Sequence, residues 1–122
     1  MDALQLLLSR EKVLPVQEKE VKIKRLSPKG QEPVVFSLRS LSYNRVAELK
    51  KIGGEDMKLH ILLAGIKSPD LKNQELLDKY GAATPLDLLK ILLLPGEIED
   101  LSLAVERLSG YRVDTIEEIK KK

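Results

Sequence analysis

The segment from Thr84 to Ile98 constrains the fold most, because it places a helix start and a helix stop around a nearly continuous run of leucines. Thr84 and Pro85 favour a helix N-terminus, since a hydroxyl caps free amides and proline suits the first helical position. Pro95 ends the helix, because proline disfavours a helical conformation at the residue before it. The apolar residues between these signals are Leu86, Leu88, Leu89, Ile91, Leu92, Leu93 and Leu94. A helix this apolar must be surrounded by other helices or by another chain.

Length and composition favour one domain spanning residues 1–122. A chain of 122 residues can bury a modest core. The absence of cysteine excludes disulfides and thiolate metal sites and fits a reducing compartment. No apolar run approaches the roughly 20 residues that span a bilayer, and the N-terminus lacks the features of a secretory signal. We therefore expect a cytoplasmic protein without membrane contact.

Residues 1–19 combine a short apolar helix with a linker. Asp2 is placed to cap about two helical turns that end near Ser9. Because so short a helix is not stable alone, its leucines must dock on the core, on another copy or on a partner. From Arg10 to Glu20 the sequence is polar and Pro15 interrupts it, which indicates a linker.

Residues 20–41 alternate charged and apolar side chains at a period of two, which is typical of half-exposed strands. The segments 18–26 and 33–38 are the two strands, and Ser27–Gly30 has the composition of a turn. We predict a two-stranded antiparallel hairpin. A lone hairpin is marginal in water, so its apolar face should lie on the helices or continue a sheet with another copy.

Positive charge is concentrated in residues 10–29, where seven Lys and Arg oppose three Glu. This excess fits either a basic stripe for RNA or an acidic partner, or a solvated strand face whose lysines discourage edge pairing. We favour the solvated face. The net charge of the whole chain is only +2, and aromatic residues for base stacking are scarce at 3%.

Residues 42–122 form the helical part. Caps, prolines and glycines divide it into short helices, which we expect near residues 43–52, 55–66, 69–80, 85–94, 97–109 and 115–119. Asp114 or Thr115 would cap the last helix, and Lys120–Lys122 suit its C-terminus. An a/d seam of about two heptads spans the fifth helix through Leu94, Ile98, Leu101, Val105 and Leu108. The expected fold is mainly α with one N-terminal β-hairpin (α+β): a short helix, the hairpin, then about six short helices packed around the leucine-rich central helix.

No catalytic constellation emerges from the sequence. His60 is the only histidine, so a His–His metal pair is impossible, and no nucleophile motif accompanies it. The glycines lack the pattern of a phosphate-binding loop. Glu97, Glu99 and Asp100 are explained as an acidic first helical turn. We expect a protein that is not an enzyme and that has no cofactor or metal.

Several leucines exceed what the local periodicity requires. Leu4, Leu7 and Leu8 lie in the short N-terminal helix, and Leu88 and Leu92 lie in the leucine-rich helix. Each buried leucine contributes roughly 1.5–3 kcal/mol of apolar transfer, so a stripe of three or four can hold a partner helix reversibly. We expect these five residues to form a partner-binding surface.

An ordered series of motifs covers the chain from about Glu20 to Tyr111. The motifs are Val21–Leu26 with Val35–Leu41, Ile61–Leu71, Glu75–Pro85, Leu92–Ile98 and Leu108–Tyr111. The series resembles the XkdN-like tail assembly chaperones of long-tailed phages and prophages. Lys67–Leu71 and Leu94–Ile98 match the family's most recognisable motifs, although both are also helix boundaries.

The resemblance implies a factor without enzymatic activity, encoded between the tail tube and tape measure genes. Such a factor would bind the tape measure protein, keep it soluble and help to recruit tail tube subunits, and it would be absent from the mature virion. Some phages make an extended form by ribosomal frameshifting. The family brings no catalytic residues. We also expect self-association, because weak contacts add up when a binder is multivalent.

Two other functions stay open at this point. The first is a nucleic-acid-binding module that uses the basic hairpin. The second is a structural tail component that is retained in the particle.

Overall fold

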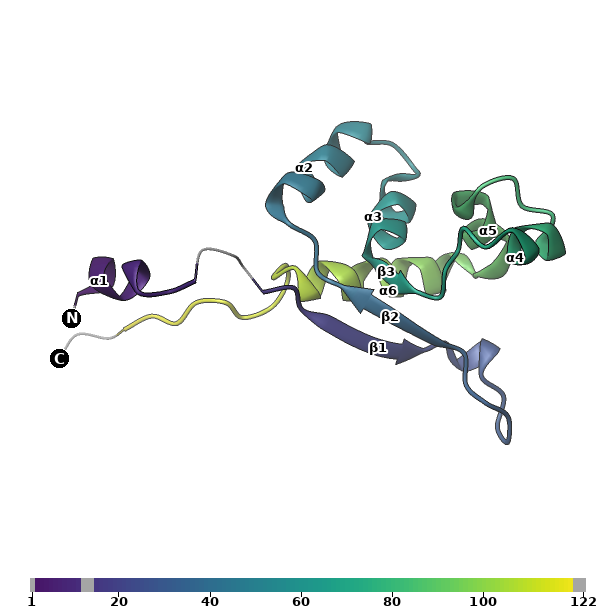
Figure 1. The fold of residues 1–122 in the computed structure, drawn as a ribbon, viewed down its shortest axis with the longest axis horizontal. Coiled ribbons are helices and arrows are strands. Elements are labelled where there is room, and N and C mark those ends of the chain that lie inside the picture. Colours follow the sequence, from purple (N-terminus) through teal and green to yellow (C-terminus); the bar gives the residue numbers. More distant parts are fainter. Residues whose placement is uncertain (1, 12–14, 120–122) are drawn as a thin grey trace.

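The computed structural model describes residues 2–11 and 15–119. Residues 12–14 of the expected linker and the expected helix end Lys120–Lys122 lie outside the described residues. Within the described part, six α-helices, one 3-10 turn and three strands follow one another (Figure 1). They are α1 (Ala3–Leu8), β1 (Glu18–Lys22), η1 (Lys24–Leu26), β2 (Val35–Arg39), α2 (Tyr43–Ile52), α3 (Met57–Gly65), β3 (Ile66–Ser68), α4 (Gln74–Tyr80), α5 (Pro85–Leu92) and α6 (Pro95–Leu108).

The strands form an antiparallel sheet in the order β1-β2-β3. The predicted pairing of the first two strands is confirmed, with Val21 opposite Phe36. The prediction of only two strands is wrong, because Ile66–Ser68 leaves α3 and pairs with β2 across an irregularity at Ser37 and Leu38. A three-residue strand shows no period-two pattern, so only its pairing with β2 reveals it.

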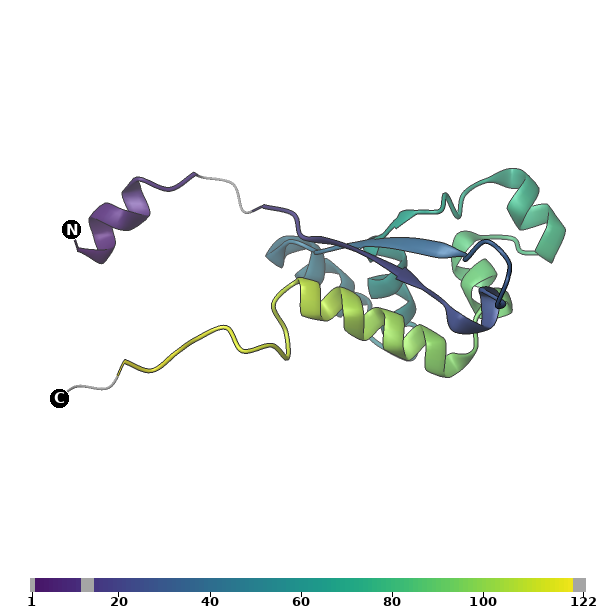
Figure 2. The same cartoon turned by 90° about the horizontal axis from the view of Figure 1, so that it is seen from below.

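One face of the sheet is covered by α3 and α6 (Figure 2). Alternation along β2 explains this arrangement, since Phe36 and Leu38 are buried while Val35 and Arg39 are exposed. The predicted half-exposed character of the hairpin is therefore confirmed. Its apolar face lies on the helices of the same chain.

The helix at the centre is α3, not the leucine-rich α5 as predicted. α3 contacts α2, α5, α6 and β3, and its contact with α6 is the most extensive between helices. Gly65 makes this contact possible, since a Cβ built there would lie 2.5 Å from both methyl carbons of Val105. α5 still contributes Leu88 and Leu89, which are fully buried, but its Ile91 faces solvent.

Several predicted helix boundaries shift in the structure. α4 begins at Gln74, because the Asn73 side chain accepts a hydrogen bond from the Leu76 amide. The preceding residues 69–73 form turns instead of a first helical turn. The predicted helix at 115–119 is wrong, since residues 114–119 have no regular secondary structure and are all exposed. Ile116 and Ile119 are 87 and 89% exposed, so within the described residues this segment lacks the tertiary packing that a short helix needs.

Candidate functional site

The four leucines of α1 form an exposed apolar surface, which we call the leucine segment: Leu4, Leu6, Leu7 and Leu8. A capping box begins α1: the Asp2 carboxylate accepts a hydrogen bond from the Gln5 backbone amide, and the Gln5 side chain accepts one from the Asp2 backbone amide. The four leucines are 51 to 75% exposed, and α1 buries no residue. This helix therefore presents apolar area that the rest of the described chain leaves uncovered.

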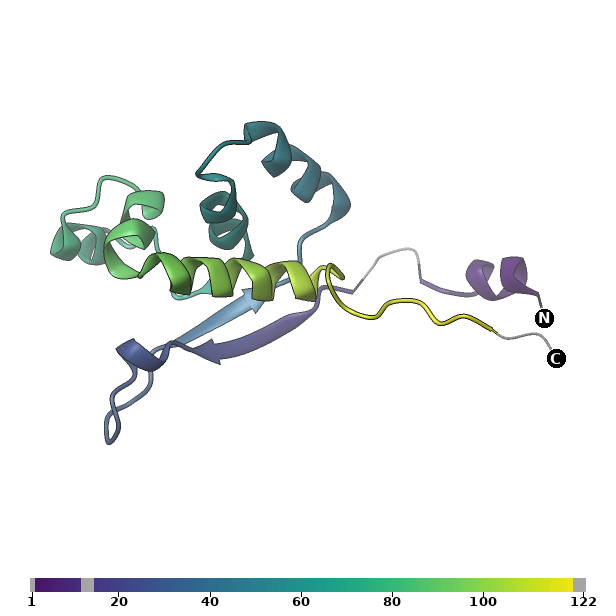
Figure 3. The ribbon, with the colours of Figure 1, turned by 180° about the vertical axis from the view of Figure 1, so that it is seen from behind.

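A largely apolar groove lies where α6 ends and β1 begins. It consists of two hollows of about 490 and 210 Å³ that share Leu41, Val46, Ser109 and Tyr111, and we call it the terminal groove. Val16 lines the larger hollow and Val105 the smaller one. Figure 3 shows the start of β1 beside the end of α6. A groove of this size can accept apolar side chains of a partner.

Hydrogen bonds and a cation–π contact hold the walls of the terminal groove in place. The Ser109 hydroxyl accepts from the Leu41 amide at 2.9 Å and donates to the Val105 carbonyl at 2.9 Å. The Lys50 ammonium lies 5.3 Å from the centre of the Tyr111 ring. These contacts connect α2, and Leu41 shortly before it, to the end of α6. The groove is therefore a preformed feature of the folded body.

Both terminal segments leave the body at the same end of the molecule, near the start of β1 and the end of α6 (Figures 1 and 3). Pro15–Gln17 line the groove on the N-terminal side, and Tyr111 lines it before the C-terminal segment begins. The leucine segment is thus tethered to the rim of an apolar groove by a short stretch of chain. Two apolar surfaces are available at one end of the molecule.

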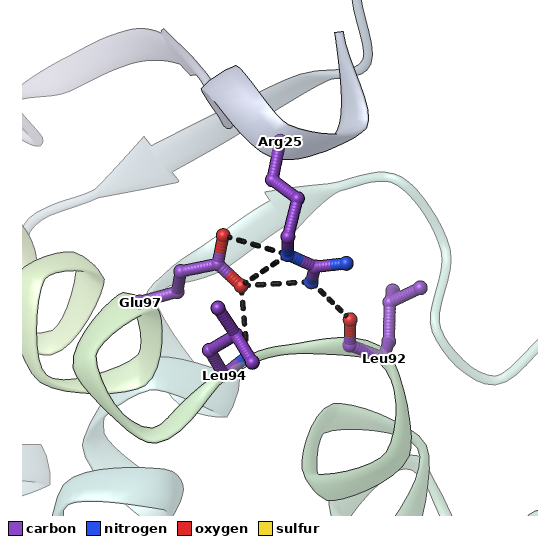
Figure 4. Close-up of polar contacts among 4 residues, drawn as sticks. All are labelled: Arg25, Leu92, Leu94 and Glu97. Atoms are coloured by element: carbon purple, nitrogen blue, oxygen red, sulfur yellow. Dashed lines mark hydrogen bonds and ion pairs between the residues drawn. The ribbon is translucent and has the colours of Figure 1, made fainter.

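The junction of α5 and α6 is fixed by Arg25 of η1 (Figure 4). The Arg25 guanidinium donates to both carboxylate oxygens of Glu97 at 2.8 to 3.2 Å and to the Leu92 carbonyl at 2.7 Å. Glu97 also accepts from the Leu94 amide at 2.7 Å, which caps α6. The Arg25 and Leu94 hydrogen bonds lower the pKa of Glu97. The motif Leu94–Ile98 therefore has a structural role at this junction.

The predicted partner-binding residues differ in how much of each side chain is exposed. Leu4, Leu7 and Leu8 are exposed, as the prediction required. Leu88 is fully buried in the hydrophobic core, so the expectation that it forms accessible surface is wrong. Leu92 is half-buried and packs against the core. Sequence reasoning missed the terminal groove, because its residues come from distant segments and have no shared periodicity.

The outer face of the sheet carries charges of both signs. Glu18 of β1 lies opposite Arg39 of β2, and the Lys67 ammonium of β3 lies 2.8 Å from the Glu18 carboxylate. Arg25, which was counted in the basic excess, is paired with Glu97. This mixture fits a solvated face better than a phosphate-binding stripe.

Two kinds of feature are absent from residues 2–11 and 15–119. No three His, Asp or Glu side chains gather there in a way that would hold a metal ion. No helix in the same part of the chain is both long and apolar enough to span a bilayer.

Comparisons with known proteins give two findings. The family profile described as "Phage XkdN-like tail assembly chaperone protein, TAC" matches residues 4–120. The crystal structure of the protein yqbn superposes with a TM-score of 0.65 and 22% sequence identity, covering 81% of this chain and 89% of that one. At this identity the similarity shows a shared fold. Comparison with curated proteins gives no match.

The family profile includes almost the whole chain, from the leucine segment to the C-terminal segment. It confirms the resemblance drawn from the ordered motifs, and it indicates a general role in tail assembly in which catalysis is not expected. The chain belongs to the XkdN-like family of phage tail assembly chaperones.

Proposed function

We propose that this protein is a non-enzymatic chaperone that binds the tape measure protein during the assembly of long phage tails. It keeps this client soluble in the host cytoplasm and helps to recruit tail tube subunits around it. It then leaves, and is absent from the mature virion. Family membership supports the general role. The surface chemistry supports the choice of an apolar, helical client.

The leucine segment is the observation that carries the proposal. Four leucines on a six-residue helix are more than half exposed, although leucine is normally a core residue. Keeping them in water costs free energy that a partner can recover by covering them. A helix that presents its apolar side to another helix is a common mode of protein recognition.

The terminal groove provides the second half of the site. Because the leucine segment is tethered at the groove rim, a client helix lying over Val16, Leu41 and Tyr111 can be covered by α1 from the other side. Burying three leucines would contribute roughly 4–9 kcal/mol before the cost of immobilising the client. The net affinity is therefore moderate, which suits a factor that must later be released.

Co-expression tests the proposal. A fragment of the tape measure protein that is insoluble alone is produced with the wild-type chain, and soluble material is purified through a tag on the chaperone. We expect the fragment to stay in solution and to elute with the chaperone in light-scattering chromatography. A fragment that precipitates equally with and without the chaperone would refute the proposed function.

A further inference from the structure

The smaller hollow of the terminal groove lies where three helices converge. Its volume is about 210 Å³, and it is lined by pairs of residues four positions apart on α2, on α3 and at the end of α6: Val46 and Lys50, Met57 and Ile61, and Val105 and Ser109. Residues at this spacing lie on one face of a helix, so each helix presents one face to the hollow. Ile61 and Val105 are buried and form its floor.

The interior of the smaller hollow favours an apolar ligand. Ser109 lines it, but the Ser109 hydroxyl already accepts from the Leu41 amide and donates to the Val105 carbonyl. Among the described residues, no buried side-chain nitrogen or oxygen lacks a hydrogen-bond partner. A polar group that entered the interior would therefore lose its contact with water and find no free side chain to bond.

Three charged side chains lie at the mouth of the smaller hollow. Lys50, Glu106 and Arg112 line it, and none of them is buried. Arg112 and Glu106 form an ion pair at 3.5 Å, but the Arg112 side chain is 66% exposed, so the pair contributes little and leaves the guanidinium accessible. Lys50 makes no ion pair within the described residues, and its ammonium lies 5.3 Å from the centre of the Tyr111 ring. One cation at this mouth thus already contacts an aromatic ring.

Volume and chemistry together favour an aromatic ring as the ligand. An apolar cavity of about 150 Å³ can take up a benzene molecule, so a hollow of about 210 Å³ has room for one aromatic side chain. The Met57 thioether is a favourable neighbour for the edge of a ring. The cations of Lys50 and Arg112 attract the face of a ring. A saturated side chain such as leucine fits the same volume but gains neither contact.

We propose, on the basis of the proposed function, that the smaller hollow binds one aromatic side chain of the client helix. The leucine segment can cover apolar area of any kind, whereas the hollow discriminates between aromatic and aliphatic residues. A ring seated on Ile61 and Val105 fixes which turn of the client helix lies over the terminal groove. The hollow thus determines specificity, and the leucine segment adds buried area.

Two small alcohols of similar size test the hollow without a client. Benzyl alcohol carries an aromatic ring, and cyclohexylmethanol carries its saturated counterpart. Each is titrated into the isotope-labelled full chain, and the NMR signals of the Ile61, Val105 and Ser109 backbone amides report binding. The filled variant carries Val46→Phe, which places a larger side chain in the hollow, and its matched control carries Val35→Phe at an exposed position of β2. Circular dichroism establishes that both variants fold.

We expect benzyl alcohol to shift these signals saturably and to bind at least about threefold more tightly than cyclohexylmethanol. Val46→Phe should abolish the shifts, while Val35→Phe should bind as the wild type does. Lys50→Gln changes an exposed residue and requires no repacking. It should weaken benzyl alcohol binding roughly two- to fivefold without affecting cyclohexylmethanol, and Lys51→Gln, on the next residue of α2, should change neither.

Four results of these titrations would overturn the proposal. They are no shifts with either alcohol, equal affinities of the wild type for both alcohols, shifts that persist in Val46→Phe, and a Lys50→Gln variant that binds both alcohols less tightly to the same extent.

The client itself provides the second test. Isothermal titration measures binding of a soluble helical fragment of the tape measure protein in which each aromatic residue in turn is replaced with leucine. One of these replacements should weaken binding to the wild type at least about fivefold, and the same replacement should have no effect on binding to Val46→Phe. A fragment that binds equally well after every such replacement would overturn the aromatic preference and leave the proposed function intact. A fragment that does not bind the wild type at all would refute both.

Discussion

Arg25 and Glu97 are 72 positions apart in the sequence, yet they form a two-pronged ion pair whose shortest N–O distance is 2.8 Å (Figure 4). The same guanidinium binds the last carbonyl of α5, and the same carboxylate caps the first turn of α6. One pair thus connects the end of the hairpin to the junction of two helices. The Glu97 side chain is 19% exposed and the Arg25 side chain 43%, so water screens the pair only in part.

Replacing Glu97 with alanine should destabilise the protein more than replacing Glu99 with alanine. Glu99 also forms a 2.8 Å ion pair, with Lys58, but its side chain is 65% exposed and caps no helix. Loss of Glu97 removes both a helix cap and an ion pair that bridges distant segments. Urea unfolding of both variants measures the difference. Equal unfolding midpoints would contradict the structural role given to Glu97.

Stability should depend on pH through Glu97. Its pKa in the folded state is lowered below the ordinary value of 4.5, first by the Arg25 hydrogen bond and then by the Leu94 amide. The unfolded state therefore binds the proton more readily, so this contribution is complete above the ordinary pKa and is lost as pH falls through the folded pKa. The difference in unfolding free energy between wild type and Glu97→Gln should be constant near neutral pH and shrink in acid. A difference that grows in acid would have the wrong sign.

Gly65→Ala should destabilise the contact between α3 and α6. The new Cβ would lie 2.5 Å from the Val105 methyl carbons, so the helices must separate, at a cost of about 1–3 kcal/mol. Adding Val105→Ala removes the clashing methyl groups. In a double-mutant cycle, Gly65→Ala should therefore cost less in the Val105→Ala background than in the wild type. If the changes in unfolding free energy of the two substitutions simply add, the contact between residue 65 and the Val105 methyl groups does not cause the destabilisation.

Substitution of Leu88 should destabilise the protein, whereas substitution of Leu7 should leave its stability almost unchanged. Leu88 is fully buried, so Leu88→Ala should cost about 2–5 kcal/mol of unfolding free energy. Leu7 is 68% exposed, so Leu7→Ser should change stability by no more than about 0.5 kcal/mol. Thermal and urea unfolding measure both. A large loss of stability in Leu7→Ser would mean that α1 packs on the body.

Local signals in the sequence predicted much of this fold. Thr84 caps α5 as predicted, and a cap at Ser42 begins α2 while Gly81 ends α4 in a left-handed conformation, because these effects act within one helical turn. The alternation along the hairpin likewise predicted a buried face, and this holds for Phe36 and Leu38, whereas Val34 on the same predicted face is 39% exposed.

The predictions that were wrong concern features that depend on tertiary contacts. β3 exists only because β2 offers it a partner, and Leu88 is buried because α5, which contacts α3 and α4, turns it into the hydrophobic core. The helix signals around Thr115 act locally, but Ile116 is 87% exposed among the described residues and gains no packing that would stabilise a helix. For the candidate site, the excess of leucine at Leu4, Leu7 and Leu8 was readable from sequence. The terminal groove was not, since it brings Val16 and Tyr111 together from opposite ends of the chain.

The most direct test of the central claim is the affinity of the full chain for a soluble helical fragment of the tape measure protein. Isothermal titration compares the wild type with a variant carrying Leu4→Ser, Leu7→Ser and Leu8→Ser. The matched control carries Val34→Ser, Ile52→Ser and Ile91→Ser, three aliphatic residues that are 39 to 55% exposed elsewhere on the body. Since about 1.4 kcal/mol corresponds to tenfold in affinity, losing three leucine contacts should weaken binding at least tenfold, while the control binds as the wild type does. Equal affinities for wild type and leucine variant would contradict the claim that the leucine segment holds the client.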